Sequence, residues 1–192
     1  MNTAATTTAS NAFLASEQAL RDLREEFDLA FSLEPIGNGG EAENFLVLKI
    51  AGDAYALSVS QISGLYAGRG ITLLPSPLPE LIGLAGFRAQ VTPVYDLAAL
   101  LGYPPATTSK WIIVLRHESP VAVAFEEFHS HLSIAPERIT ASGFARPQHS
   151  NIASHLRDAI RAGGAIFPII DVQSILNDIQ QRVDATRSIK ER

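Results

Sequence analysis

The stretch Phe45–Ile62, FLVLKIAGDAYALSVSQI, returns later in the chain as Trp111–Phe128, WIIVLRHESPVAVAFEEF, at an offset of 66 positions and without a gap. In both segments an aliphatic run is followed by a polar turn and a second apolar run. Two such runs around a short turn predict a β-hairpin, which in the first segment pairs Phe45–Ile50 with Tyr55–Val59. We therefore expect the same hairpin to be built twice.

A second pair of matching segments follows the two hairpins. VTPVYDLAALL at 91–101 matches IFPIIDVQSIL at 166–176 at an offset of 75 positions, with the same proline, aspartate and final leucine. Two matches in the same order indicate two copies of one architecture, at approximately 45–102 and 111–176, the second with an insertion of 9 residues. A copy of about 65 residues is marginally stable alone, so we expect the copies to share an apolar interface.

Short apolar runs separated by glycine and proline fill the rest of these copies. Beyond the first hairpin we expect strands at Ile71–Leu74, Leu84–Phe87 and Gln90–Tyr95, with the stiff segment PSPLP at 75–79 between them. Many short strands with such turns are typical of β-barrels rather than of an α/β sheet. The sequence therefore predicts a mainly β protein of two small barrels with short helices.

Asp96 and Asp171 hold equivalent places in the two copies, which raises the possibility of an aspartic-protease pair. Such a pair needs two carboxylates that share a proton, each on a glycine-supported turn. No glycine follows either aspartate directly, so we interpret both as N-caps of the helices that follow. A further helix is expected at Ile152–Ala162, where Arg157 and Arg161 would lie on a solvated face.

The ends of the chain differ from the repeats in composition and residue spacing. The expected organisation is a disordered tail at 1–11, an N-terminal amphipathic helix and Gly-rich linker at 12–40, the main domain at 41–180, and a C-terminal tail at 181–192. The helix spans 12–33, with apolar residues spaced by seven. It either docks on the main domain or serves partner binding or self-association, and the sequence leaves both open.

The composition excludes several classes of protein. The chain has no cysteine, so disulfides, thiolate catalysis and cysteine-based zinc sites are ruled out. A formal net charge of −5 argues against nucleic acid as the main partner, because phosphate binding needs a basic face. No run approaches the ~18 apolar residues of a membrane span, and the first ten residues lack the pattern of a secretory signal. We therefore expect a cytoplasmic protein without membrane insertion.

The segment Leu78–Leu97, LPELIGLAGFRAQVTPVYDL, resembles the signature of the CheW-like family of bacterial chemosensory adaptors. The opening hairpin, the strand at Trp111–Leu115 and the closing segment Ile166–Leu176 also lie where that family has them. The resemblance covers roughly 45–178. It implies two five-stranded SH3-like barrels with a hydrophobic junction, no active site and no cofactor.

The resemblance also implies partners and contact residues. Family members connect the cytoplasmic tip of a chemoreceptor to the regulatory domain of a CheA-like histidine kinase. The functional arginine of the family falls on Arg88, next to Phe87, and the residues facing the receptor fall around Val59, Ile62 and Leu65. In this interpretation exposed apolar patches dock on the partners, and the Arg88 guanidinium offers forked hydrogen bonds to a carboxylate or carbonyl.

Two positions depart from the family pattern. Ala89 stands where a glycine usually follows the arginine, and it would be strained if the turn needs a positive φ. Gly64 stands near a position that is often acidic. Either departure is compatible with an altered partner or a specialised pathway such as pilus-type motility.

Two other classes of function remain open from the sequence. His129 and His131 would face the same side of a strand, with Glu126 and Glu127 close by, and such a set can hold zinc in a small metal-dependent enzyme. The solvated edge of a sheet is the simpler interpretation of this pattern. A nucleic-acid-binding barrel is disfavoured by the charge balance and by the lack of clusters that combine Lys or Arg with aromatic residues.

Overall fold

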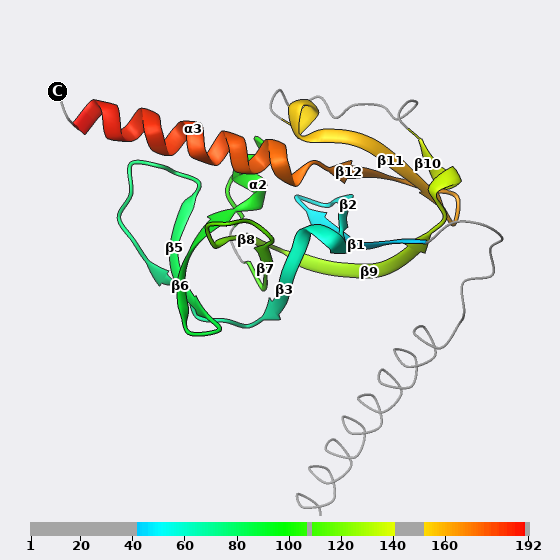
Figure 1. Cartoon of the computed structure of the whole chain (residues 1–192), viewed down its shortest axis with the longest axis horizontal. Helices are drawn as coiled ribbons and strands as arrows, with labels where there is room; N and C mark the ends of the chain where they lie inside the picture. Colours follow the sequence, from blue (N-terminus) through cyan, green and yellow to red (C-terminus); the bar gives the residue numbers. More distant parts are fainter. Residues whose placement is uncertain (1–41, 107–108, 141–151, 191–192) are drawn as a thin grey trace, which may run out of the picture. The chain divides into compact units, whose positions relative to one another are not determined.

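The structure, a computed structural model, describes residues 42–106, 109–140 and 152–190, so the expected N-terminal tail, helix and linker lie outside the described residues. The described part of the chain forms twelve strands in two sheets (Figure 1). The strands are β1 (Glu43–Ile50), β2 (Asp53–Ser58), β3 (Ile62–Ala67), β4 (Thr72–Leu73), β5 (Leu81–Phe87), β6 (Gln90–Asp96), β7 (Trp111–Leu115), β8 (Val121–Phe125), β9 (Glu127–Ile134), β10 (Ile139–Thr140), β11 (Leu156–Ala162) and β12 (Ala165–Ile170). The helices are α2 (Leu97–Leu100), α3 (Val172–Lys190) and three 3-10 helices, η1 (Val59–Gln61), η2 (Pro136–Arg138) and η3 (Ile152–His155).

The prediction of a mainly β protein with two similar halves is confirmed. Each sheet has six strands, and in each the outermost strand on one side, β4 or β10, is only two residues long. Each half therefore contains five longer strands and one short edge strand. Equivalent strands recur in both halves: β5 and β11 are offset by 75 positions, as are the turns that follow them.

The two sheets do not correspond to the two sequence copies, which corrects the expectation of one barrel per copy. The first sheet has the order β10-β11-β12-β2-β1-β9, and the second has the order β3-β7-β8-β6-β5-β4. Each hairpin from the start of one copy therefore pairs with strands from the end of the other copy. The junctions are parallel pairs, with Ile169 opposite Ala56 between β12 and β2, and Val94 opposite Ala122 between β6 and β8.

The exchange of strands follows from the apolar character of both hairpins. In β7, Ile112 and Val114 face the core of the second sheet, while Ile113 and Leu115 face a larger core shared by both sheets. The strands β1 and β2 are arranged in the same way, since Leu48 contributes to the shared core. A strand with two apolar faces must be covered on both, and the shared core provides the second cover. The expected apolar interface between the copies is therefore present.

The C-terminal third of the chain differs from the prediction in two places. Residues 152–162 form η3 and the strand β11 instead of a helix, because β11 pairs with β12 on one side and β10 on the other. The apolar positions Leu156, Ala159 and Ile160 have a spacing that also suits a helix, and long-range pairing decides the outcome. Residues 181–190, expected to be a tail, continue α3 to Lys190.

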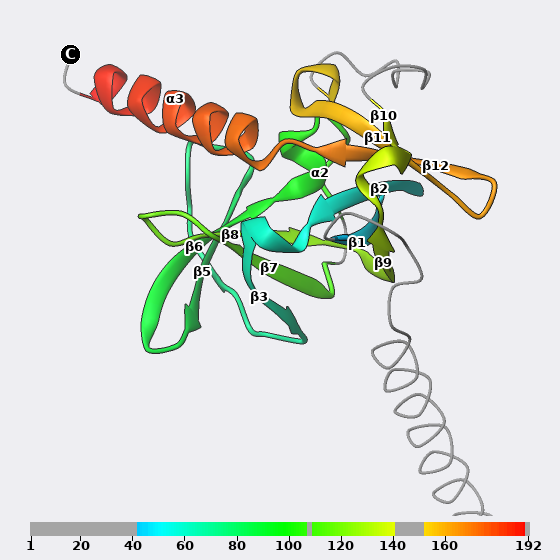
Figure 2. The same ribbon diagram turned by 45° about the vertical axis from the view of Figure 1, so that its right-hand side comes forward.

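Figures 1 and 2 show the hairpins β5–β6 and β11–β12 on opposite sides of the described body, and α3 runs from the end of β12 along the top, toward the side of β5–β6. No helix of the described residues is both long and apolar enough to cross a membrane.

Candidate functional site: the β5–β6 hairpin and its surroundings

The hairpin β5–β6 ends in a two-residue turn formed by Arg88 and Ala89. Phe87 pairs with Gln90 across the turn, and φ is 46° at Arg88 and 63° at Ala89. Positive φ at both central residues is the pattern of a type I′ turn, which matches the twist of the flanking strands but normally selects Asn or Gly. The turn does require a positive φ at Ala89, so the strain considered from the sequence is present.

The Arg88 side chain is exposed and weakly held. Its Nη2 donates to the backbone oxygen of Ser63, 3.4 Å away, which is a long hydrogen bond and the single contact of this kind that Arg88 makes among the described residues. A guanidinium has five N–H donors. Most of them therefore remain available at the tip of the hairpin to a carboxylate or carbonyl of another molecule.

Phe87, expected as a contact residue next to Arg88, is buried instead. Its ring packs against the Tyr66 ring with centroids 4.7 Å apart, and both belong to the core of the second sheet or its margin. The Arg69 guanidinium lies over the Tyr66 ring, 5.5 Å from its centroid. Phe87 therefore supports the base of the turn and does not itself present a surface to a partner.

Gly64 provides the space in which the Tyr66 ring lies. A Cβ atom at position 64 would come within 2.7 Å of Tyr66 Cε2 and 2.9 Å of its hydroxyl oxygen. A side chain of any kind at this position would therefore displace the ring from Phe87. The acidic residue that the family pattern suggested near this position has no room in this chain while Tyr66 keeps its place.

The three residues expected to face a receptor differ in exposure. Val59, in η1, is 37% exposed, and Leu65 is partly buried against the shared core. Ile62 is part of that core and is only 8% exposed, so it supports the surface from below. Trp111 and Phe128, which the sequence did not mark as contact residues, also lie partly buried at the margin of the shared core, with ring centroids 5.7 Å apart.

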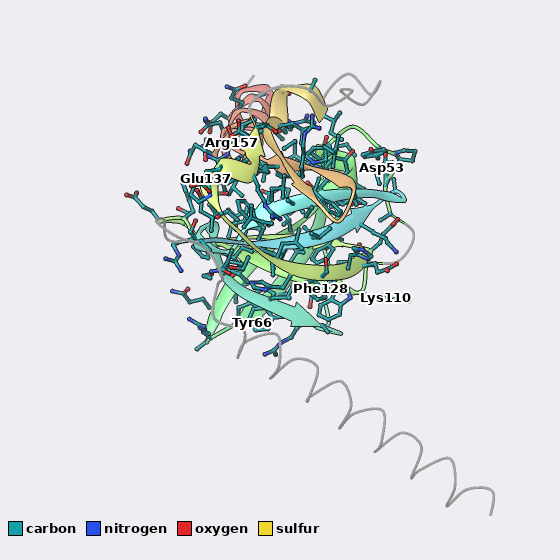
Figure 3. All side chains as sticks on the ribbon, turned by 90° about the vertical axis from the view of Figure 1, so that its right-hand side faces the viewer. Asp53, Tyr66, Lys110, Phe128, Glu137 and Arg157 are labelled. Carbon is teal, nitrogen blue, oxygen red and sulfur yellow. The ribbon has the colours of Figure 1, made fainter. Side chains whose placement is uncertain are left out.

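Figure 3 shows the positions of Phe128 and Lys110 near one another, with Tyr66 on the neighbouring edge. Lys110 precedes β7, and its backbone oxygen accepts a hydrogen bond from the Gly68 N–H. The margin of the shared core on this side is thus a mixed surface of aromatic and aliphatic side chains with a nearby cation. The signal in the sequence was the equivalence of Phe128 with Ile62 at the offset of 66.

The exposed aliphatic residues of the described chain include one pair at equivalent positions. Val91 in β6 is 70% exposed, and its equivalent in β12, Ile166, is 42% exposed. Leu73 of the edge strand β4 is 74% exposed. Val91 lies opposite Gly86 in the hairpin that carries Arg88, so an apolar side chain accompanies the guanidinium on this hairpin.

His129 and His131 lie on the exposed side of β9, as their spacing predicted. Glu127 on the same strand is already paired with Lys49, whose Nζ is 2.8 Å from its Oε1. This hydrogen bond lowers the pKa of Glu127 below its ordinary value. No group of three His, Asp or Glu side chains suited to a metal ion occurs within residues 42–106, 109–140 and 152–190.

Asp96 and Asp171 are far from forming a catalytic pair and act at separate helices. Asp96 Oδ1 accepts from the Ala98 N–H at 2.9 Å, and its Oδ2 accepts from the Ala106 N–H at 2.8 Å. Asp171 Oδ1 accepts from the Gln173 N–H at 3.1 Å and from the Ser174 N–H at 3.4 Å, both at the start of α3. Both carboxylates therefore cap the helix that follows them.

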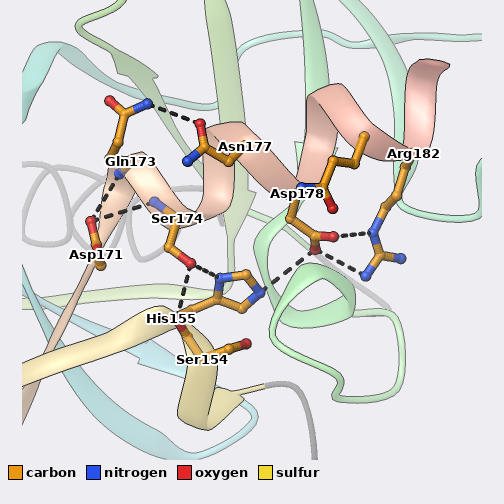
Figure 4. A pocket seen from close by; sticks show the side chains of 9 residues that line it. Ser154, His155, Asp171, Gln173, Ser174, Asn177, Asp178 and Arg182 are labelled. Atoms are coloured by element: carbon orange, nitrogen blue, oxygen red, sulfur yellow. Dashed lines mark hydrogen bonds and ion pairs between the residues drawn. The ribbon is translucent and has the colours of Figure 1, made fainter.

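A polar depression of about 400 Å³ lies beside α3 and was not expected from the sequence. Its wall includes His155, Ser174, Asp178 and Arg182, whose contacts are drawn in Figure 4. Burial lowers the pKa of His155 below its ordinary value and Arg182 acts in the same direction, while Asp178 and Asp171 oppose the change. Single charged residues scattered over 155–182 carry no sequence signal of their own, so only the fold could reveal this cluster.

Comparison with known proteins shows similarity to one family. A family model described as the CheW-like domain matches residues 44–180. The chemotaxis protein CheW of Bacillus subtilis (strain 168) is 22% identical over 138 residues, which cover 70% of this chain and 87% of that protein. The crystal structure of the scaffolding protein TtCheW from Thermoanaerobacter tengcongensis has a TM-score of 0.58 at 18% identity, covering 67% of this chain and 88% of that one.

Proposed function

Since the chain belongs to the CheW-like domain family, we propose that it is a non-catalytic adaptor of a bacterial chemosensory pathway. In this role it couples the cytoplasmic tip of a chemoreceptor to the regulatory domain of a CheA-like histidine kinase, and it works in the cytoplasm without a cofactor. The observation that carries the proposal is the family match over 44–180, which spans both sheets. The scaffolding role named for the Thermoanaerobacter tengcongensis protein is consistent with it.

The kinase-facing contact is assigned to the β5–β6 hairpin. Arg88 extends from a strained turn with most of its donors available, and the exposed Val91 lies on the same hairpin. Strained backbone persists where the surrounding structure holds it, and it concentrates at functional positions. Arg88 would fix the register of the complex by forked hydrogen bonds, and the aliphatic surface would supply the buried area.

The receptor-facing contact is assigned to the margin of the shared core. Val59 and Leu65 offer exposed or half-exposed aliphatic surface there, above the buried Ile62. Trp111 and Phe128 extend this surface with aromatic rings, which are enriched among residues that dominate binding energy. An amphipathic helix of a receptor tip fits such a surface, because its apolar stripe can cover the margin.

The first experiment is a calorimetric titration of the full chain into the regulatory domain of the CheA-like kinase from the same organism. We expect saturable one-to-one binding, and loss of binding in a folded Arg88→Glu variant. Arg138→Glu is the matched control, because Arg138 is an exposed arginine of η2 in the other half of the body. Absence of binding to every CheA-like kinase of the host would refute the kinase-coupling role.

Metal analysis of the purified chain tests the enzyme alternative. A scaffold should contain no stoichiometric metal, whereas a metal-dependent enzyme that uses His129 and His131 should retain one. Stoichiometric zinc that is lost in a His129→Ala variant would favour the enzyme over the adaptor.

A further inference from the structure

Glu80 and His155 are equivalent positions of the two copies, at the offset of 75. Each directly precedes the first strand of a hairpin, β5 or β11. Both are buried, at 7% and 5% exposure. Their backbone oxygens play the same part: that of Glu80 accepts from the Asp96 N–H at 2.8 Å, and that of His155 accepts from the Asp171 N–H at 2.7 Å. These are the two roots of the hairpins β5–β6 and β11–β12.

Two residues of α3 connect these roots. Arg182 pairs with Glu80 through Nη1, and it pairs with Asp178 through Nε at 3.0 Å and Nη2 at 3.0 Å. Asp178 Oδ2 in turn lies 3.6 Å from His155 Nε2 (Figure 4). The hydrogen bond that Arg182 donates to Asp178 also raises the pKa of Arg182, so the guanidinium stays charged. We call these four residues the charged row.

The proton on His155 can be placed from its other contact. Ser174 Oγ donates to the backbone oxygen of Ser154 at 3.0 Å, so it must accept from His155 Nδ1, which lies 2.8 Å away. In the neutral imidazole the Nε2 lone pair then faces Asp178 Oδ2, a buried oxygen that is paired with Arg182 Nη2 at 3.0 Å, so no proton lies between Nε2 and Oδ2. This end of the row is therefore its weakest link, held by the Ser174 contact and by packing.

The helix α3 is anchored differently along its length. Its first half buries Val172, Ile175 and Ile179 in the shared core. Beyond Ile179 its apolar contact is limited, among the residues with described side chains, to the partly buried Val183. Segments with few buried apolar contacts open with low free energy, so the pairing of Arg182 with Glu80 is what holds this part of α3 to the second sheet.

We propose that α3 is a strap that couples the two halves, and that the charged row is its latch. When the latch is closed, the roots of β5 and β11 are held at one relative setting. When it opens, α3 beyond Ile179 releases Glu80, and both roots loosen together. The consequence for partner binding rests on the proposed function. The latch acts at the root of the hairpin β5–β6 and thereby sets the position of Arg88 at its tip.

The test is hydrogen exchange of the full chain alone, in two variants that each change one end of the row. Glu80→Gln removes the carboxylate charge, and His155→Asn keeps a donor to Ser174 while it removes the contact with Asp178. Glu127→Gln is the matched control, since it removes a carboxylate from the exposed pair with Lys49. Arg182→Lys is a milder variant, which keeps the charge but loses the forked geometry.

We expect Glu80→Gln to raise exchange in Leu156–Ala162 by about tenfold, and His155→Asn to raise it similarly in Leu81–Phe87. Arg182→Lys should raise exchange in both segments by a smaller factor. Glu127→Gln should leave exchange in both segments unchanged. In the double variant Glu80→Gln/His155→Asn the two effects should be clearly less than additive. Either change alone already opens the latch, so the second change has little left to disrupt.

Effects confined to the mutated end would overturn the proposal, as would full additivity in the double variant. A rise that includes β7 to the same extent would also overturn it, because it would indicate global unfolding instead of release of a strap. The measurement needs no partner. Its result is therefore separate from the calorimetric test of Arg88, and either can fail while the other succeeds.

Discussion

Ala89 and Gly164 occupy the same position in two equivalent hairpins and share a left-handed backbone, with φ of 63° and 79°. The preceding residues, Arg88 and Gly163, are matched in the same way, with φ of 46° and 56°. One copy thus builds the turn with two glycines, and the other builds it with an arginine and an alanine. The backbone demand is the same, so the first hairpin bears a conformational cost that the second avoids.

Replacement of Ala89 by glycine should stabilise the protein. A left-handed residue with a Cβ costs roughly 1–2 kcal/mol, and part of the gain is offset by the greater freedom of glycine in the unfolded chain. We expect Ala89→Gly to raise the free energy of unfolding by about 1 kcal/mol. Urea denaturation followed by circular dichroism measures it.

Ala135 provides the control for this substitution. Its φ is −67°, in the extended region, so a glycine there relieves no strain. Ala135→Gly should therefore lower the free energy of unfolding by about 0.4–1 kcal/mol. If both substitutions changed stability in the same direction, strain at Ala89 would not be the cause.

The space at Gly64 predicts a destabilised Gly64→Ala variant. The new methyl group would displace the Tyr66 ring from Phe87, and overpacking of this kind costs about 1–3 kcal/mol. Gly86→Ala, on strand β5 of the same sheet, meets no atom within 4 Å and should change stability much less. Removal of the obstructing ring in Gly64→Ala/Tyr66→Ala should recover part of the loss at position 64, and simple additivity of the two changes would contradict the explanation.

The two caps should differ in strength although they are equivalent in sequence. Asp96 is buried and accepts two backbone hydrogen bonds, which fix both the start of α2 and the segment at Ala106. Asp171 is less buried, and both of its backbone hydrogen bonds, from Gln173 at 3.1 Å and from Ser174 at a longer 3.4 Å, lie at the start of α3 itself. We expect Asp96→Ala to cost about 2–3 kcal/mol and Asp171→Ala about 1 kcal/mol in the free energy of unfolding. Equal losses in chemical denaturation would show that the Ala106 contact adds nothing.

The stability of the protein should depend on pH through His155. Its pKa is lowered in the folded state, first by burial, so the unfolded chain takes up the proton more readily. The contribution of this residue is therefore complete above its ordinary pKa of about 6.5 and is lost as the pH falls through the lower folded value. In urea unfolding the stability of the parent should decline as the pH falls below about 7, and the decline should be smaller in His155→Asn. An equal decline in both proteins would exclude His155 as its source.

Much of the fold could be predicted because the signal is local. The alternation and turns of Phe45–Ile62 indicate a hairpin, and its return at Trp111–Phe128 indicates two copies. The N-caps Asp96 and Asp171 and the exposed turn at Arg88 also follow from short-range patterns. The same reasoning failed at 152–162, where the apolar spacing suits a helix, and pairing with β10 and β12 makes a strand.

By itself, then, the sequence of this protein determined the type of each hairpin, the twofold repeat, the need for a shared core and the position of Arg88, because these depend on the order of residues over a few turns of chain. Only the tertiary structure decided that each hairpin joins the other copy's strands, and that Ile62 and Phe87 are buried beneath the surface they were expected to form. It also decided that Glu80 is linked to His155 through charged residues of α3. These outcomes depend on which apolar faces cover one another across distances of tens of residues. Such pairing is selected by the total burial of the folded chain, and no local pattern records it.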